Sequence, residues 1–240
     1  MSNPAVAILE SALRAKKLDR TLTTAIPPGK GEGAVVPTDV AALDAVLHGG
    51  LPRGELSEIA GAPSSGRTTL LLQVIAAATR RGEIAAFIDT FDRLDVASVG
   101  AAGIDLDRLL WVRGEASSPP DRAIERALKA LNLVLQSGGF GIAVIDLADA
   151  PPSALHRLPF TTWMRVQRTI EGSEMACVIA GPQPIGRSAG GLTLTLDGES
   201  RWTGSANRLA GLDAVVRVVS PRRRVEGEAE IAAAFTDRNQ

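Results

Sequence analysis

The sequence predicts an α/β domain with a mostly parallel central sheet and helices on both faces. Apolar, strand-like segments alternate with segments of helical periodicity along most of the chain. A glycine-rich loop joins one of these strands to an apolar helix, and a later apolar strand ends in an acid, Asp146. In folds of this class the ligand site lies at the carboxyl edge of the parallel strands.

The composition is that of a globular protein with room for a full core. The chain has 240 residues, of which 45% are hydrophobic and 22% charged, and its formal net charge is −1. Nucleic-acid contact would therefore have to come from local patches, and the 3% aromatic content argues against a base-stacking single-strand binder. No signal peptide or membrane-length apolar run is visible, so we expect a cytoplasmic protein with no membrane partner.

Two parts of the chain differ in character. Residues 1–33 are expected to form an amphipathic N-terminal helix followed by a Pro/Gly linker, and residues 34–240 to form the core domain. The helix either docks on the core or serves as an arm for a neighbouring subunit or partner. The single cysteine, Cys177, lies in an apolar run and is expected to be a buried strand residue.

The core is expected to alternate between strands and helices. Strands are predicted at 55–60, 84–89, 109–113, 141–146 and 175–180, with strand-like segments at 191–196 and 213–219. Helices are predicted at 39–47, from Leu70 onward, at 95–102, from Pro119 to Gly138, and at 153–171 with an interruption at Pro159.

The loop at residues 61–69 fits the phosphate-binding pattern of Gly, four residues, Gly, a basic residue and Ser/Thr. Its two glycines allow positive φ, so that successive N–H groups can point into one concavity at a helix N-terminus. Arg67 stands where lysine is usual. The expected nucleotide-binding residues in the loop are Gly61, Pro63, Ser64, Ser65, Gly66, Arg67, Thr68 and Thr69.

Asp146 is predicted to complete this site. A carboxylate at the carboxyl end of a core strand is typical of the second nucleotide motif, where it faces Mg²⁺ or its water. Thr68 and Asp146 are therefore the expected Mg²⁺ ligands if nucleotide is bound.

The run from Leu43 to Leu110 resembles the core of the RecA recombinase family. The similar segments are 43–47, 49–54, 58–69, 72–78, 86–89 and 103–110, and a weaker similarity continues through Asp146 to the strand near Val178. The resemblance implies a RecA-like P-loop core that uses ATP and Mg²⁺, touches DNA through local loops, and permits oligomers.

Three positions depart from the pattern of the family. Phe91 stands at the position of its catalytic glutamate, Ser98 at that of the tyrosine that stacks on adenine, and Arg67 at that of the P-loop lysine. Asp95 matches a residue that contacts adenine and is retained. A phenyl ring cannot accept a proton, and arginine does not replace lysine freely, so we expect no catalytic residue and weak or absent binding of ATP and Mg²⁺.

A short RecA-like chain with a degenerate ATP site resembles the ImuA proteins. That resemblance, which includes the segment 186–190, implies an accessory or adaptor role in the SOS response to DNA damage, in translesion synthesis and mutagenesis. Its expected partners are recombinase and/or translesion polymerase proteins. Two alternatives stay open: an active DNA-dependent ATPase or recombinase that uses Arg67 and Asp92, and a regulator of recombinase filaments.

Some further residues are candidates for DNA or partner contact, and some are better explained as structural. Arg187 lies in a Gly/Pro loop, and Trp202 in a polar segment where it either anchors a partner or covers a sheet edge. Arg222, Arg223 and Arg224 could contact phosphates, although acids follow closely and a solvated turn is the simpler interpretation. His48 and His156 lack metal-ligand spacing and are expected to be structural.

Overall fold

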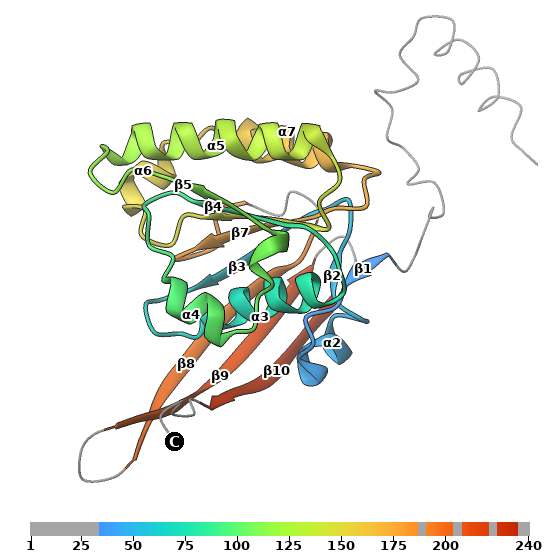
Figure 1. Ribbon diagram of the computed structural model, residues 1–240, viewed down its shortest axis with the longest axis vertical. Coiled ribbons are helices and arrows are strands. Elements are labelled where there is room, and N and C mark those ends of the chain that lie inside the picture. The colour runs from blue at the N-terminus through green and yellow to red at the C-terminus, as the bar shows by residue number, and fades with distance from the viewer. Residues whose placement is uncertain (1–33, 187–190, 204–207, 221–224, 235–240) are drawn as a thin grey trace, which may run out of the picture. The chain divides into compact units, whose positions relative to one another are not determined.

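The computed structural model describes residues 34–186, 191–203, 208–220 and 225–234 (Figure 1). Their main sheet has the strand order β10-β9-β8-β3-β7-β6-β4-β5. The strands are β3 (Leu56–Gly61), β4 (Ala85–Asp89), β5 (Leu109–Arg113), β6 (Ile142–Asp146), β7 (Ala176–Gly181), β8 (Thr193–Thr203), β9 (Arg208–Ser220) and β10 (Val225–Ala234). A separate pair is formed by β1 (Val35–Val36) and β2 (Leu51–Pro52).

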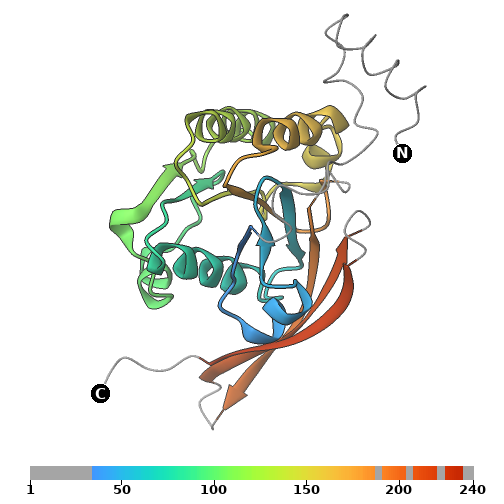
Figure 2. The same cartoon turned by 90° about the vertical axis from the view of Figure 1, so that its right-hand side faces the viewer.

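Helices cover both faces of this sheet (Figures 1 and 2). One apolar core lies between the sheet and α2, α3 and α4, and the other lies between the sheet and α5, α6 and α7. The helices are α2 (Ala41–Val46), α3 (Arg67–Arg80), α4 (Val96–Ala101), α5 (Pro120–Ser137), α6 (Pro152–His156) and α7 (Phe160–Ile170), with a 3₁₀ turn at Leu106–Arg108. The predicted α/β class with a mostly parallel sheet is confirmed.

The sheet is parallel from β8 through β3, β7, β6 and β4 to β5. Since parallel strands end at the same edge, the loops after them meet there. Asp89 pairs in register with Asp146, and Ala60 pairs with Gly181. The phosphate-binding loop, the acid at the end of β6 and the segment after β4 therefore share one edge of the sheet.

The helix boundaries follow from local sequence. Pro120 occupies the first turn of α5, where its missing N–H costs nothing, and Gly138 ends that helix with φ +69°. Pro159 separates α6 from α7, because proline cannot continue a helix through its own position. The predicted interruption at Pro159 is confirmed.

The carboxyl-terminal strands differ from the prediction. The segments 191–196 and 213–219 belong to the longer strands β8 and β9, and β10 was not predicted. In β10 the acids Glu226, Glu228 and Glu230 alternate with small or apolar residues, and they lie on the exposed side while Ala229 is buried. This period of two is the signal of a half-exposed strand, which its alanine and glycine content had obscured.

Other expectations fall on residues that the structure does not describe. The N-terminal helix and linker predicted for residues 1–33 lie outside the described residues, as do Arg187 and Arg222 to Arg224. Within the described part of the chain, no helix is long and apolar enough to cross a membrane.

Candidate nucleotide-binding site

The loop between β3 and α3 has the backbone form of an anion-binding nest. Ser64 has φ +66° and Gly66 has φ +88°, whereas Ser65 between them keeps a negative φ. Alternation of this kind turns neighbouring N–H groups toward one point. Gly66 is the N-cap of α3 and brings no side chain to cap it, so the positive end of the helix dipole faces the same concavity.

Close packing explains why the loop needs both glycines. A Cβ on Gly61 would lie 2.3 Å from Ser65 Oγ and 2.9 Å from the carbonyl oxygen of Leu196. A Cβ on Gly66 would lie 2.5 Å from Leu212 Cδ2, in addition to the strain of its positive φ. Strands β8 and β9 thus form a wall against the back of the loop, which the sequence pattern did not reveal.

The loop is open on one side and buried on the other. Pro63, Ser64 and Thr68 are exposed, and Thr69 is partly exposed. Ser65 and Arg67 are buried, with residual exposures of 4% and 8%. Among the described residues, neither Ser65 Oγ nor Arg67 Nε has a hydrogen-bond partner. A buried polar atom without a partner costs about 1–3 kcal/mol, so the loop holds polar groups suited to a ligand.

Arg67 lies across the ends of two strands. Its Nη1 donates hydrogen bonds to the carbonyl oxygen of Gly61 at the end of β3 and, at 3.0 Å, to that of Gly181 at the end of β7. Burial lowers the pKa of the guanidinium, an effect that the nearby carboxylates of Asp146 and Asp149 partly offset. The cation therefore serves here as a bridge between backbone carbonyls.

Asp146 lies at the end of β6, two strands from the loop with β7 between them. Burial raises the pKa of its carboxyl group to about 6, while the N–H of Ala148 and the charge of Arg67 act in the opposite direction. A bound divalent cation would favour the ionised form of this group. The structure thus brings Arg67 and Asp146 together at one edge of the sheet.

Phe91 stands in the loop after β4, is partly buried, and packs against the core on the α5–α7 side. Helix α3, which carries the phosphate-binding loop, belongs to the core on the opposite face. The ring has no group that could accept a proton or orient water. The loop itself is held by Asp89, whose buried carboxylate accepts hydrogen bonds from the N–H groups of Arg93 and Leu94.

Asp92, the nearest carboxylate to Phe91 in sequence, is turned toward β5. It adopts φ +57° and accepts hydrogen bonds from Arg113 Nε at 2.8 Å and Nη2 at 2.9 Å. These hydrogen bonds lower the pKa of Asp92. A carboxylate held in this way is a weaker base than an unpaired one.

Asp95 and Ser98 are hydrogen-bonded to each other at the start of α4. Asp95 Oδ2 accepts hydrogen bonds from the N–H and the hydroxyl of Ser98, both at 2.7 Å, and these contacts lower the pKa of Asp95. The expected adenine contact is therefore engaged as a helix N-cap. Ser98 offers no ring on which a base could stack.

Sequence reasoning missed Glu58, an acid inside a buried strand. Its Oε2 accepts hydrogen bonds from the N–H groups of Ile185 at 2.6 Å and Gly186 at 2.7 Å. Glu58 therefore fixes the segment that follows β7. A charged residue within the apolar run of β3 was the available signal, because buried carboxylates require partners.

The remaining candidates lie away from the loop. Trp202 is 60% exposed near the end of the β8–β9 hairpin, where it pairs in register with Leu209, itself 40% exposed.

His156 Nε2 lies 3.4 Å from Gln183 Nε2. Burial raises the pKa of the Cys177 thiol to about 12, in keeping with its expected place in a buried strand.

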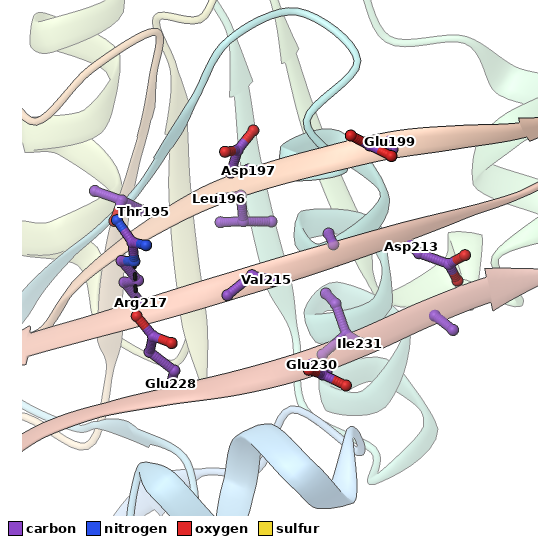
Figure 3. Close-up of a pocket in the computed structure, with 12 residues that line it drawn as sticks. Thr195, Leu196, Asp197, Glu199, Asp213, Val215, Arg217, Glu228, Glu230 and Ile231 are labelled. Atoms are coloured by element: carbon purple, nitrogen blue, oxygen red, sulfur yellow. Dashed lines mark hydrogen bonds and ion pairs between the residues drawn. The ribbon is translucent and has the colours of Figure 1, made fainter.

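A hollow of about 840 Å³ lies on the exposed face of β8, β9 and β10 (Figure 3). Its polar lining consists mainly of carboxylates, and Arg217 in its wall is paired with Glu228 at 2.7 Å. Carboxylates repel phosphates, so this hollow is not a nucleotide site. Among the described residues, no group of three or more His, Cys, Asp or Glu side chains converges as a metal site.

The RecA N-terminal domain family matches residues 29–154, more than half of the chain. The chain belongs to the RecA family. Protein RecA of Clavibacter michiganensis is 46% identical over 118 residues, which are 49% of this chain and 31% of that protein. Protein RecA of Salinispora tropica is 46% identical over 120 residues (50% and 32%), and that of Borrelia hermsii 41% over 124 residues (52% and 33%).

The chain spans about a third of the length of these RecA relatives. A crystal structure of the RadB recombinase matches the described fold with a TM-score of 0.61 at 18% identity, covering 84% of this chain and 96% of that one. At this identity the likeness shows the fold alone. Family and fold together support the expected RecA-like core.

Proposed function

We propose that this chain is an accessory or adaptor protein of DNA-damage-induced translesion synthesis, similar to the ImuA proteins. It acts through protein contacts, and its ATP site supports little or no hydrolysis. The observation that carries the proposal is Phe91: the position of the family's general base holds a partly buried ring that packs against the core, and the adjacent carboxylate of Asp92 is paired with Arg113.

The site retains groups that fit a nucleotide. The N–H groups of the nest would hold phosphate oxygens, and Thr68 and Asp146 would hold Mg²⁺, which neutralises phosphate charge when it is bound. Arg67 is engaged with backbone carbonyls and Asp95 with Ser98. ATP binding must displace or share these contacts, which supports weak binding.

Partners are expected among recombinase and translesion polymerase proteins of the cytoplasm. Trp202 and Leu209 form an exposed apolar pair suited to anchoring a protein partner. Residues 1–33 are proposed as an N-terminal helix and linker, and residues 34–240 as the core domain. DNA or partner contact is proposed first for Arg187 and only second for the run from Arg222 to Arg224, for which a solvated turn is the simpler interpretation.

Deletion of the gene in its native host tests this function. We expect damage-induced mutation frequency to fall while recombination between homologous DNA persists, and the wild-type gene to restore mutagenesis. Asp92→Ala should restore it equally well. Loss of recombination with unchanged induced mutagenesis would contradict the adaptor role.

The second candidate is a DNA-dependent ATPase or recombinase. The retained nest and the RecA relatives at 41–46% identity favour it. This function needs Asp92 as the base, so it requires hydrolysis that disappears in Asp92→Ala.

A further inference from the structure

Arg67 connects the phosphate-binding loop to the segment that follows β7. Its Nη1 donates to the carbonyl oxygen of Gly181, 114 positions along the chain, as well as to that of Gly61 in the loop itself. The two acceptors end neighbouring parallel strands, since Ala60 pairs with Gly181. Nη1 of Arg67 thus connects the backbone at the start of the phosphate-binding loop to the backbone at the start of the segment Gly181–Gly186.

The segment from Gly181 to Gly186 is tied at its other end as well. Glu58 of β3 accepts the N–H groups of Ile185 and Gly186. Between the two ties stand Pro182 and Pro184, whose rings fix φ and stiffen the backbone. The segment is therefore a short, stiff connection between Gly181 and the hydrogen bonds with Glu58.

A phosphate bound by the N–H groups of the nest would also attract the guanidinium of Arg67. Arg67 is the one basic side chain within the loop motif, and its side chain is buried against carbonyl oxygens. The Nε atom of Arg67 is buried and has no hydrogen-bond partner among the described residues. A ligand could reach this atom only if the side chain rotates. Such a rotation removes Nη1 from Gly181.

We propose that a polyphosphate in the loop competes with the Gly181 carbonyl for Arg67, so that ligand binding loosens the segment Gly181–Gly186. The hydrogen bond between Arg67 and Gly181 is thus an internal contact that opposes ligand entry. The inference rests on the nucleotide-binding part of the proposed function and adds its regulation. By thermodynamic linkage, the contact between Arg67 and Gly181 also lowers the affinity for the ligand.

Hydrogen exchange at the amides of Ile185 and Gly186 tests the competition. Mg-ATP and inorganic triphosphate are added to the full chain, and binding is measured separately by calorimetry. We expect both amides to exchange about tenfold faster in the bound state, the change that follows loss of one good hydrogen bond. Arg67→Met, which keeps the apolar stem and removes the donors, should show the fast exchange without ligand and no further change with it.

Arg80→Met is the matched control, because Arg80 lies in the last turn of the same helix and pairs with the exposed Asp39 at 3.1 Å. It should behave as the wild type does. Binding without faster exchange would overturn the coupling and leave nucleotide binding standing. Unchanged exchange in a folded Arg67→Met, or no binding by the folded wild type, would overturn the competition, whereas the adaptor role is judged by mutagenesis in the host.

Discussion

Arg113 holds Asp92 by two hydrogen bonds, of 2.8 and 2.9 Å, one to each carboxylate oxygen. The guanidinium of Arg113 also lies over the ring of Trp111, 4.6 Å from its centre. The ring of Trp111 thus helps to position Arg113, and Arg113 holds the carboxylate of Asp92 beside β5, the edge strand of the sheet. The acid beside Phe91 in sequence is oriented toward β5, which supports the proposal that it does not replace the general base.

Asp92→Ala is therefore expected to leave any basal ATP turnover unchanged within about twofold. General bases contribute about 10²–10⁴-fold to a rate, so a true base would show a far larger loss. Phosphate release with and without single-stranded DNA measures the effect. Arg113→Ala, which frees the carboxylate, should likewise leave turnover unchanged; a hundredfold loss in Asp92→Ala would favour the ATPase function.

The raised pKa of Asp146 predicts that stability depends on pH. Its pKa in the folded chain is about 6 against an ordinary 3.8, so between these values the folded state binds more protons than the unfolded state. The free energy of unfolding should fall by about 2–3 kcal/mol in total as the pH rises through this window. Above it, the free energy of unfolding should level off.

Urea unfolding of the wild type and of Asp146→Asn from pH 4 to pH 8 measures that contribution. The amide of Asp146→Asn does not ionise. The free energy of unfolding of this variant, relative to that of the wild type, should therefore increase as the pH rises to about 6. A difference that stays constant with pH would contradict the assignment. Since Mg²⁺ prefers the carboxylate form, any Mg²⁺-dependent binding should strengthen over the same range.

Much of the fold could be predicted because its signals are local. The strand Leu109–Arg113 and the break at Pro159 follow from apolar runs and from proline, each readable within a few residues. The hydrogen bond from Arg67 to Gly181 and the pairing of Glu58 with Ile185 join residues more than a hundred positions apart. No local pattern encodes such contacts.

The same distinction explains the carboxyl-terminal strands. β10 is rich in alanine and glutamate, which have low strand propensity, and it is a strand because β9 pairs with its whole length. The wall that β8 and β9 place behind the phosphate-binding loop followed from tertiary packing in the same way. The exposure of Trp202 likewise depends on its place near the end of a hairpin.

Gly66→Ala should destabilise the chain more than Gly82→Ala. The two glycines have nearly equal φ values, +88° and +87°, but a Cβ on Gly66 meets Leu212 at 2.5 Å while one on Gly82 meets no described atom within 4 Å. Both changes cost about 1 kcal/mol for the left-handed backbone. We expect a further loss of about 1 kcal/mol at Gly66, because the terminal methyl group of Leu212 must shift, as measured by urea unfolding. Equal losses would contradict the packing of β9 on the loop.

Cys177 should resist thiol reagents in the folded chain. Its side chain is fully buried in β7, and burial raises the pKa of the thiol to about 12, so almost no thiolate forms at neutral pH. Reaction with a maleimide should be slow in buffer and fast in denaturant. Labelling in buffer as fast as in denaturant would place this strand at the surface.

ATP turnover by the purified full chain, with and without single-stranded DNA, tests the central claim most directly. Phe91 and the paired Asp92 predict phosphate release no faster than that of Arg67→Ala, even at millimolar Mg-ATP. DNA-stimulated turnover of about 1 s⁻¹ or more, the lower end of ordinary turnover numbers, that is lost in Arg67→Ala would contradict the adaptor account and establish an enzyme.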